Sequence, residues 1–256
     1  MTAQGQPAAP SSGQFWDLYS HMYDSVNHLM PYRALMWDSY AALDLEPGMK
    51  VLDAGCGTGN FEAFIAEKNP PAIELQAVDF SPSMLERARA KCAGHDFADF
   101  AWADLDAPLP FPDNTFDRIV SINVLYTLPN QDRTMREFLR VLKPGGRMVL
   151  TSPAPGYRMA PLAADHFRRV RNIWGAGRKV MRVLSGVGML CTSALGAFLL
   201  NVLVIYRREK AGQYHALDET ELRGFLTEYQ KSGLGEFKIT PNFAQQNLFA
   251  TAMKVA

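Results

Sequence analysis

The residues best suited to chemistry are those of a glycine-rich loop and the acid that precedes it. Residues 51–60 read VLDAGCGTGN, so Asp53 is followed by glycines at alternate positions, Gly55, Gly57 and Gly59. Glycines leave the loop without side chains, and a ligand can therefore lie against backbone N–H groups at the start of the next helix. The spacing differs from the G-x-G-x-x-G of dinucleotide sites, and a carboxylate here would repel a pyrophosphate but attract an ammonium group. The loop predicts a site for a ligand with a cationic end.

Two more acids follow predicted strands downstream of this loop. Asp79 ends the run 73–79, and Asp104 lies near the end of the run 100–105. In doubly wound sheets an acid about twenty residues after the glycine loop hydrogen-bonds ribose hydroxyls, and Asp79 has that spacing. Because the carboxyl ends of parallel strands meet at one edge of a sheet, we expect the three acids to line one rim.

Strands and helices are expected to alternate around these acids in one α/β domain. A helix is expected over 58–68, and the pair Ser81-Pro82 is typical of a helix start. Two more helices are expected over 131–141, where the sequence KPGG follows, and over 218–230. The remaining strands are expected at 116–121, 147–151, 236–240 and 247–253.

Taken in order, these motifs make residues 48–151 resemble the class I S-adenosylmethionine-dependent methyltransferases. The motifs that carry the resemblance are VLDAGCGTGN, AVDFSPSML, AWADL, FDRIVSINVLY and LKPGGR. The resemblance implies a Rossmann-like, doubly wound seven-stranded sheet with its last strand antiparallel. It also implies S-adenosyl-L-methionine as the cofactor and methyl transfer as the reaction.

The same resemblance carries cofactor roles onto positions around the loop. The methionine moiety would be held by Asp53 and by the loop residues Gly55, Cys56, Gly57, Thr58 and Gly59. Asp79 would hold the ribose. Ser121 and Asn123 would line the methionine side near the methyl group.

The adenine would be held by residues that follow the second and third strands. Phe80 and Met84 would flank the ring, and Asp104 with Leu105 would read its edge. The family often has a histidine where this chain has Tyr126, so Tyr126 is a candidate for the substrate side without an assigned catalytic role.

No catalytic residue and no metal site are predicted. An acceptor lone pair attacks the sulfonium methyl directly and the leaving group departs neutral, so positioning and desolvation are expected to suffice. The three cysteines, Cys56, Cys92 and Cys191, lack C-x-x-C spacing, which argues against a disulfide framework or a zinc site.

The N-terminal region divides into a tail and an aromatic segment. Residues 1–14 are rich in Ala, Pro, Gly, Gln and Ser and predict a flexible tail rather than a signal peptide. In the helices expected after it, Tyr19 and Tyr23 are four apart and share a face. These aromatics either pack on the flank of the sheet or form a lid whose tyrosines face the substrate.

The segment 152–212 is expected to form a helical apolar cap between the lid and cofactor module, 15–151, and the C-terminal elements that complete the sheet, 213–256. Basic residues cluster between 165 and 182, and residues 183–206 carry no charge. As a helix that run would reach roughly 36 Å, enough for a bilayer core, but one crossing would separate the last strands from their sheet. It therefore lies in the membrane interface, dips in as a hairpin, covers the active site as an apolar lid, or forms a buried helix pair of a soluble cap.

These features predict methyl transfer to a lipid or lipid-like acceptor, either a phospholipid or aminolipid headgroup or an isoprenoid quinone. The enzyme would be cytoplasmic and peripheral on the cytoplasmic membrane face, with contact through residues 165–210. A soluble methyltransferase of a hydrophobic secondary metabolite is the alternative, and a non-catalytic cofactor-binding protein is the weaker one. A formal net charge of zero and the lack of an N-P-P-Y sequence argue against nucleic acid as a partner.

Overall fold

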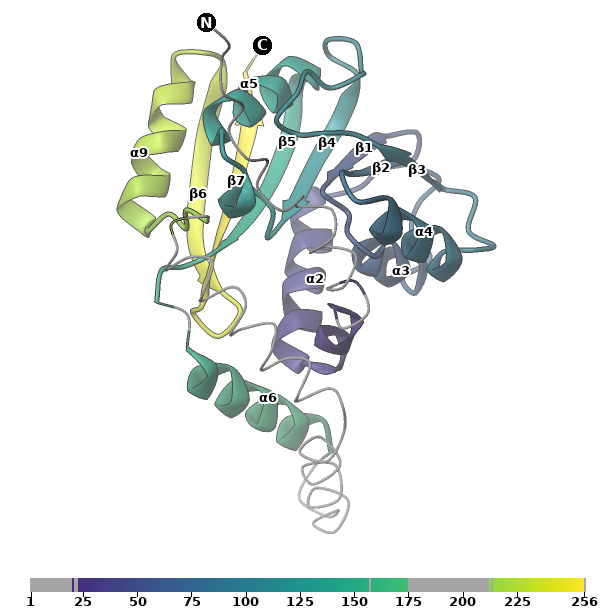
Figure 1. Ribbon diagram of the computed structural model, residues 1–256, viewed down its shortest axis with the longest axis vertical. Helices are drawn as coiled ribbons and strands as arrows, with labels where there is room; N and C mark the ends of the chain where they lie inside the picture. The colour runs from purple at the N-terminus through teal and green to yellow at the C-terminus, as the bar shows by residue number, and fades with distance from the viewer. Residues whose placement is uncertain (1–19, 21–22, 157, 175–211, 213, 256) are drawn as a thin grey trace, which may run out of the picture.

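The computed structural model describes residues 20, 23–156, 158–174, 212 and 214–255. Its centre is a seven-stranded sheet in the order β3-β2-β1-β4-β5-β7-β6, which spans Figure 1 from β6 on the left to β3 on the right. The strands are β1 (Lys50–Ala54), β2 (Glu74–Asp79), β3 (Ala98–Trp102), β4 (Phe116–Ile122), β5 (Leu142–Pro153), β6 (Leu234–Asn242) and β7 (Asn247–Lys254). β7 runs antiparallel to both of its neighbours, and the neighbouring pairs from β3 to β5 are parallel. The predicted fold class is confirmed.

Alternating side chains of the strands bury both faces of the sheet, as expected for strands covered on two sides. Val51 contributes to the core of one face and Leu52 to the core of the other. The first face is covered by α2 (Met30–Leu43), α3 (Asn60–Ala66) and α4 (Pro82–Lys91), and the second by α5 (Gln131–Val141) and α9 (Glu219–Gln230). Short 3-10 helices, η1 (Asp24–His28) and η2 (Leu125–Thr127), complete this part of the fold.

Side-chain caps fix where several of these helices begin. The Ser81 hydroxyl accepts the N–H of Met84 at the start of α4, where Pro82 is the first helical residue. Asp218 and Glu221 form a reciprocal capping box at the start of α9. The sequence signals for these helix starts are therefore confirmed.

Several element ends differ from the expected ranges: the helix expected over 58–68 is α3, Asn60–Ala66, and the ends of β3 and β5 also differ. β3 ends at Trp102, so Asp104 lies two residues beyond the strand. β5 starts directly after α5 and includes the KPGG turn, with an irregular register against β4. Gly145 in that turn has a positive φ of 75°, which a sequence-based strand assignment does not anticipate.

Only the first part of the predicted cap belongs to the described residues. β5 leads directly into α6 (Met159–Trp174), which lies below the sheet in Figure 1 and packs against α2. The uncharged run 183–206, like the tail 1–14, falls outside the described residues. Within the described parts of the chain, no helix combines the length and the apolar character that a membrane crossing requires.

Candidate cofactor site

The glycine loop between β1 and α3 is shaped by two close approaches of neighbouring residues. Gly55 has a φ of 89°, and a Cβ atom there would lie 2.4 Å from Cγ2 of Val124. Gly59 has a φ of 75°, and its Cβ would lie 2.9 Å from Cα of Ala88. Both the left-handed backbone and the lack of space exclude other residue types. The loop therefore presents its backbone rather than side chains at the carboxyl end of β1.

The structure brings Asp79 directly against this loop. One carboxylate oxygen of Asp79 accepts the N–H of Gly57 at 2.9 Å, and the other accepts the N–H of Ser81 at 2.8 Å. Burial raises the pKa of Asp79, while the N–H groups of Ser81, Gly57 and Phe80 oppose the rise. Each oxygen has a second lone pair available for a ligand hydroxyl. The predicted ribose contact is compatible with this geometry and stays a prediction.

Asp53 forms a buried carboxyl pair with Glu62 of α3. The two residues are 1% and 0% exposed, burial raises the pKa of both carboxyls, and the nearby Glu62 raises the pKa of Asp53 further. Glu62 was missed by the sequence interpretation. The signal was its position between Phe61 and Phe64 on a helix that packs into the core, where an acid is not expected without a function.

Polar side chains from three strands meet on the side predicted to face the methyl group. The Ser121 hydroxyl donates to the carbonyl of Ala54 at 2.8 Å. Asn123 has a φ of 57°, and its side-chain oxygen accepts from the Thr151 hydroxyl at 3.1 Å and from the Asn247 amide at 2.6 Å. Asn247 is 1% exposed and begins β7. No sequence motif pointed to it, because only the antiparallel return of β7 brings it to this rim.

The predicted adenine side carries two exposed aromatic rings. Phe80 is 40% exposed and Trp102 is 56% exposed, and their ring centroids lie 6.0 Å apart. The Trp102 indole N–H donates to the carbonyl of Phe80 at 2.8 Å. By contrast Met84 is buried. Trp102 is an additional candidate for adenine contact that the sequence interpretation did not include.

The other predicted adenine residues lie in the turn after β3. One oxygen of Asp104 accepts the N–H of Asp106 at 2.9 Å and so fixes the turn. Leu105 is buried, and its carbonyl accepts the hydroxyl of Thr134 on α5. The turn is thereby held against α5, with Asp104 only partly buried.

The segment around η1 covers the glycine loop. A Cβ on Gly57 would lie 3.7 Å from the Tyr23 ring, so this ring packs over the loop. Asp24 accepts the Thr58 hydroxyl at 2.5 Å and forms an ion pair with Lys91 at 2.7 Å. Tyr23 therefore lies beside the predicted cofactor site, as a lid residue would. Tyr19 falls outside the described residues.

Two residues predicted at the site, Tyr126 and Cys56, are buried among neighbouring side chains. Tyr126 is buried, and its ring meets that of Tyr214 edge to face at 5.3 Å. Burial raises the pKa of the Cys56 thiol well above its usual value, so Cys56 is a poor nucleophile there. In the described part of the chain no group of three metal-ligating side chains is close enough to hold an ion.

Comparison with known proteins identifies the class. A family model described as a methyltransferase domain matches residues 45–189, which is more than half of the chain. The demethylmenaquinone methyltransferase of Symbiobacterium thermophilum is 33% identical over 156 residues, covering 56% of this chain and 61% of that protein. The ubiquinone/menaquinone biosynthesis C-methyltransferase UbiE of Geobacter sulfurreducens is 31% identical over 192 residues, covering 71% and 70%. The chain thus spans less than two thirds of the first relative.

A solved structure shares the fold at lower sequence identity. The SAM-dependent methyltransferase of Aquifex aeolicus has a TM-score of 0.57 at 16% identity, with 93% of this chain and 98% of that chain covered. The chain belongs to the methyltransferase domain family, and it is an S-adenosylmethionine-dependent methyltransferase.

The site fits this cofactor on its own chemistry. A glycine loop gives close backbone approach, and buried Asp53 has an oxygen with no hydrogen-bond partner among the described residues, which an ammonium group could satisfy. When bound, the cofactor supplies an electrophilic methyl group on sulfur. Asp53 would hold its methionine moiety and Asp79 its ribose, and the lid residue Tyr23 would help to exclude water.

Proposed function

We propose that the acceptor is an isoprenoid quinone in its reduced, demethylated form, or a closely similar lipid-like aromatic. The observation that carries the proposal is the likeness to two proteins named for quinone methylation, since the aligned segments cover 56% and 71% of this chain. The acceptor is then a hydrophobic small molecule whose ring must reach the methyl side of the rim.

The arrangement of β5 and β7 supports this proposal. Asn123 and Thr151 mark the methyl side, and β5 continues from there to Pro153 and into the predicted cap. Asn247 pairs with Pro153 on the neighbouring strand, so β7 begins at the same place where β5 ends. The predicted cap follows β5 in the sequence, and it can therefore cover an acceptor bound at that side.

The first helix of this cap is anchored on the lid side. Leu162 of α6 is 1% exposed, and the N–H of Met30 in α2 donates to Nδ1 of His166 at 3.2 Å. Burial lowers the pKa of His166, which keeps this nitrogen available as an acceptor at neutral pH. α6 and α2 thus hold the entry to the cap against the cofactor module.

The chemistry requires little from acid or base groups. An aromatic carbon or hydroxyl oxygen of the acceptor would take the methyl group from the bound cofactor, whose sulfur would become neutral, and that carbon or hydroxyl would lose its proton to water. Orientation of the two molecules and removal of water supply the rate enhancement. Polar groups such as half-buried Asn123 and buried Asn247 would fix the position of the ring by hydrogen bonds.

Mass spectrometry with a defined acceptor tests the proposal. Purified enzyme, S-adenosylmethionine and a demethylated menaquinol in liposomes should yield a product heavier by one CH₂, about 14 Da. Asp79→Ala is the matched inactive control, because it is expected to weaken cofactor binding in a folded protein. Transfer only to water-soluble aromatic acceptors would overturn the quinone and favour the secondary-metabolite alternative.

We also propose that the enzyme acts as a peripheral protein on the cytoplasmic membrane face, through residues 165–210. The uncharged run 183–206 and the arginines before and after it support this proposal. Arg168 and Arg169 contribute less than the others, since both are ion-paired with Asp165.

Liposome sedimentation tests the membrane contact. The wild type should sediment with anionic liposomes and less so at high salt, because salt screens the basic flanks. Leu199→Asp with Leu203→Asp, four apart in the uncharged run, should abolish sedimentation and leave cofactor affinity unchanged. Failure of the wild type to sediment would remove the membrane contact from the proposal.

A further inference from the structure

The buried acids of the loop region have lost their hydration without gaining hydrogen-bond donors. Asp53 is 1% exposed and Glu62 is 0% exposed. One oxygen of Asp53 and both oxygens of Glu62 have no hydrogen-bond donor among the residues that the structure describes. Ionised carboxylates only accept, so the two acids can bond to each other only if one of them keeps a proton. Burying an unpaired carboxylate is costly, and retaining a proton avoids that cost.

The charged and titratable groups around the pair do not neutralise it. Asp79 from β2 and the thiol of Cys56 add no positive charge. Lys91 from α4 is the cation that acts on Glu62, but its ammonium group donates to Asp24, Thr58 and Asn60 instead. Burial raises the pKa of Asp53, and burial raises the pKa of Glu62 to about 7.

We propose that Asp53 and Glu62 share one proton in the free enzyme, and that the ammonium group of the cofactor's methionine moiety displaces it. The O–H bond of one carboxyl breaks, its proton leaves to the solvent, and the ionised pair then faces the bound ammonium. Glu62 is thereby a positioning residue that acts through Asp53. This inference rests on the assignment of S-adenosylmethionine to the site.

The proton release makes cofactor affinity depend on pH in a fixed direction. Below the pKa of the pair, each rise of one pH unit should strengthen binding by up to tenfold, and above it affinity should level off. The folding stability of the free enzyme depends on pH in the opposite direction. A folded-state pKa raised from 4.5 to about 7 favours folding below pH 4.5, and this contribution is lost as pH rises through 7.

Calorimetry in buffers of different ionisation enthalpy measures the released proton. At pH 6 the α-amino group of the cofactor stays protonated, since such groups have a pKa of about 8, so it does not complicate the count. S-Adenosylmethionine and S-adenosylhomocysteine should each release close to one proton. 5′-Methylthioadenosine, which lacks the amino-acid part, should release none.

Glu62→Gln tests the assignment to this pair. The amide can donate a hydrogen bond to ionised Asp53, so the proton released on binding should fall well below half of the wild-type value. The matched control is Glu67→Gln, five residues later at the end of α3, where the carboxylate is about half exposed and paired with Arg33. This control should keep the full release.

The outcomes separate the inference from the cofactor assignment. Tight binding of S-adenosylmethionine by the wild type with the same heat in every buffer would overturn the shared proton and leave the cofactor assignment intact. Absence of binding would overturn both. If Glu62→Gln does not fold, the pH dependence of wild-type affinity between pH 5 and 8 decides, and a flat profile there would contradict the proposal.

Discussion

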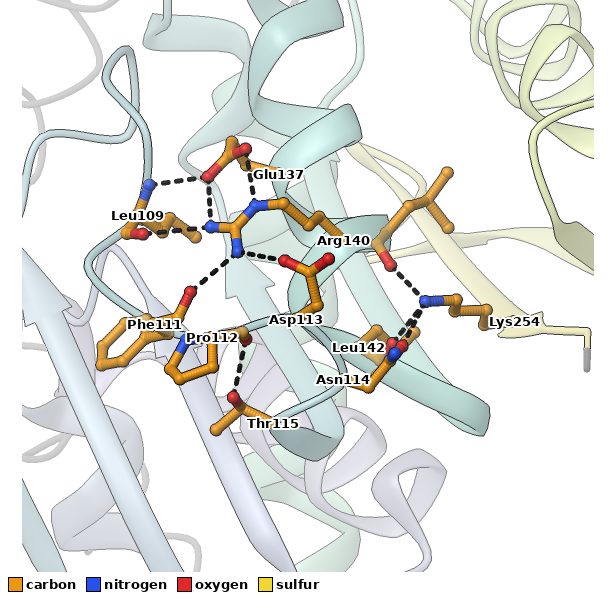
Figure 2. Close-up of polar contacts among 11 residues, drawn as sticks. Leu109, Phe111, Pro112, Asp113, Asn114, Thr115, Glu137, Arg140, Leu142 and Lys254 are labelled. Carbon is orange, nitrogen blue, oxygen red and sulfur yellow. Dashed lines mark hydrogen bonds and ion pairs between the residues drawn. The ribbon is translucent and has the colours of Figure 1, made fainter.

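The two ends of the sheet differ in whether their charged groups have hydrogen-bond partners. At the amino end of β4 and β5, Arg140 uses all five of its N–H donors, which reach Glu137 twice, the carbonyls of Leu109 and Phe111, and Asp113 (Figure 2). The hydrogen bonds from Arg140 lower the pKa of Glu137, so this pair stays ionised.

A second cation completes the amino end. Lys254, at the end of β7, donates to Asn114 and to the carbonyls of Leu139 and Leu142 at 2.7 to 2.8 Å. It ties the last strand to the end of α5, as Figure 2 shows beside Arg140. Every N–H of the two cations therefore has an acceptor within these networks.

At the carboxyl end of the sheet, by contrast, some charged groups among the described residues lack hydrogen-bond partners. In the described part of the chain one oxygen of Asp53 and both oxygens of Glu62 lack donors, Gly55 has a φ of 89°, and Asn123 has a φ of 57°. Such features cost stability and persist where a ligand uses them. The comparison teaches that the amino end stabilises the fold, whereas the carboxyl end is prepared for the cofactor.

The largest expected effect is on the amino end. Arg140→Met should lower the free energy of unfolding by about 3 kcal/mol, because Glu137 loses its charged partner and the carbonyls of Leu109 and Phe111 lose a donor. Urea unfolding measures the loss, and calorimetry should find cofactor affinity unchanged in the folded variant. Arg223→Ala removes a solvent-exposed pair with Glu219 and should cost less than about 1 kcal/mol. Equal losses in both variants would refute the structural role of Arg140.

Gly55→Ala should damage both stability and binding at the carboxyl end. Its Cβ would lie 2.4 Å from Val124 in a left-handed backbone, so we expect about 2–3 kcal/mol of destabilisation and a loss of cofactor binding. Gly94 has a similar φ of 92°, and a methyl group added there would have no atom within 4 Å, so Gly94→Ala isolates the backbone cost of about 1 kcal/mol. Thermal unfolding of the two variants gives the steric part by difference, and equal shifts would exclude a close approach at the loop.

Asp79→Ala should act mainly on binding. It removes the acceptors predicted for the ribose hydroxyls, and a hydrogen bond to a charged group contributes about 1.5–3 kcal/mol, so cofactor affinity should fall tenfold or more. Asp99→Ala on β3, whose residue is exposed, should leave affinity unchanged. Calorimetry on both folded variants is the test. If Asp79→Ala binds the cofactor as tightly as the wild type, the assignment of Asp79 to the ribose is wrong.

The smallest effect is expected at the exposed aromatic rings. Trp102→Leu should weaken cofactor binding by about 0.5–1.5 kcal/mol if its ring contacts the adenine, a loss of twofold to about tenfold. Trp37→Leu on α2 is the control, because Trp37 is also about half exposed at 52% but lies over Lys68. Equal affinities of the two variants would place the adenine away from Trp102.

The sequence predicted those residues of the site that belong to a local pattern. The glycine loop and the start of α4 follow from backbone conformation and capping, which neighbouring residues dictate, and both were found where expected. Asp79 was predicted at a strand end and lies against the loop, as its bonds to Gly57 and Ser81 show.

Residues that meet only in the folded chain could not be predicted in the same way. Asn247 reaches Asn123 because β7 inserts between β5 and β6, a pairing between residues far apart in sequence. Trp102 reads as an ordinary strand residue until β3 is seen at the edge of the sheet, where the ring stays exposed.

The sequence by itself determined the class of this protein, because cofactor binding needs a short loop whose glycines and flanking acid lie within a few residues of one another in the chain. The tertiary structure decided the ionisation of the site. In the sequence Glu62 is an acid between two aromatic residues of a helix, and it becomes a partner of Asp53 only when the fold buries both carboxyls. Burial and proximity are properties of the packed molecule, and they alone turn two ordinary acids into a pair with a shared proton.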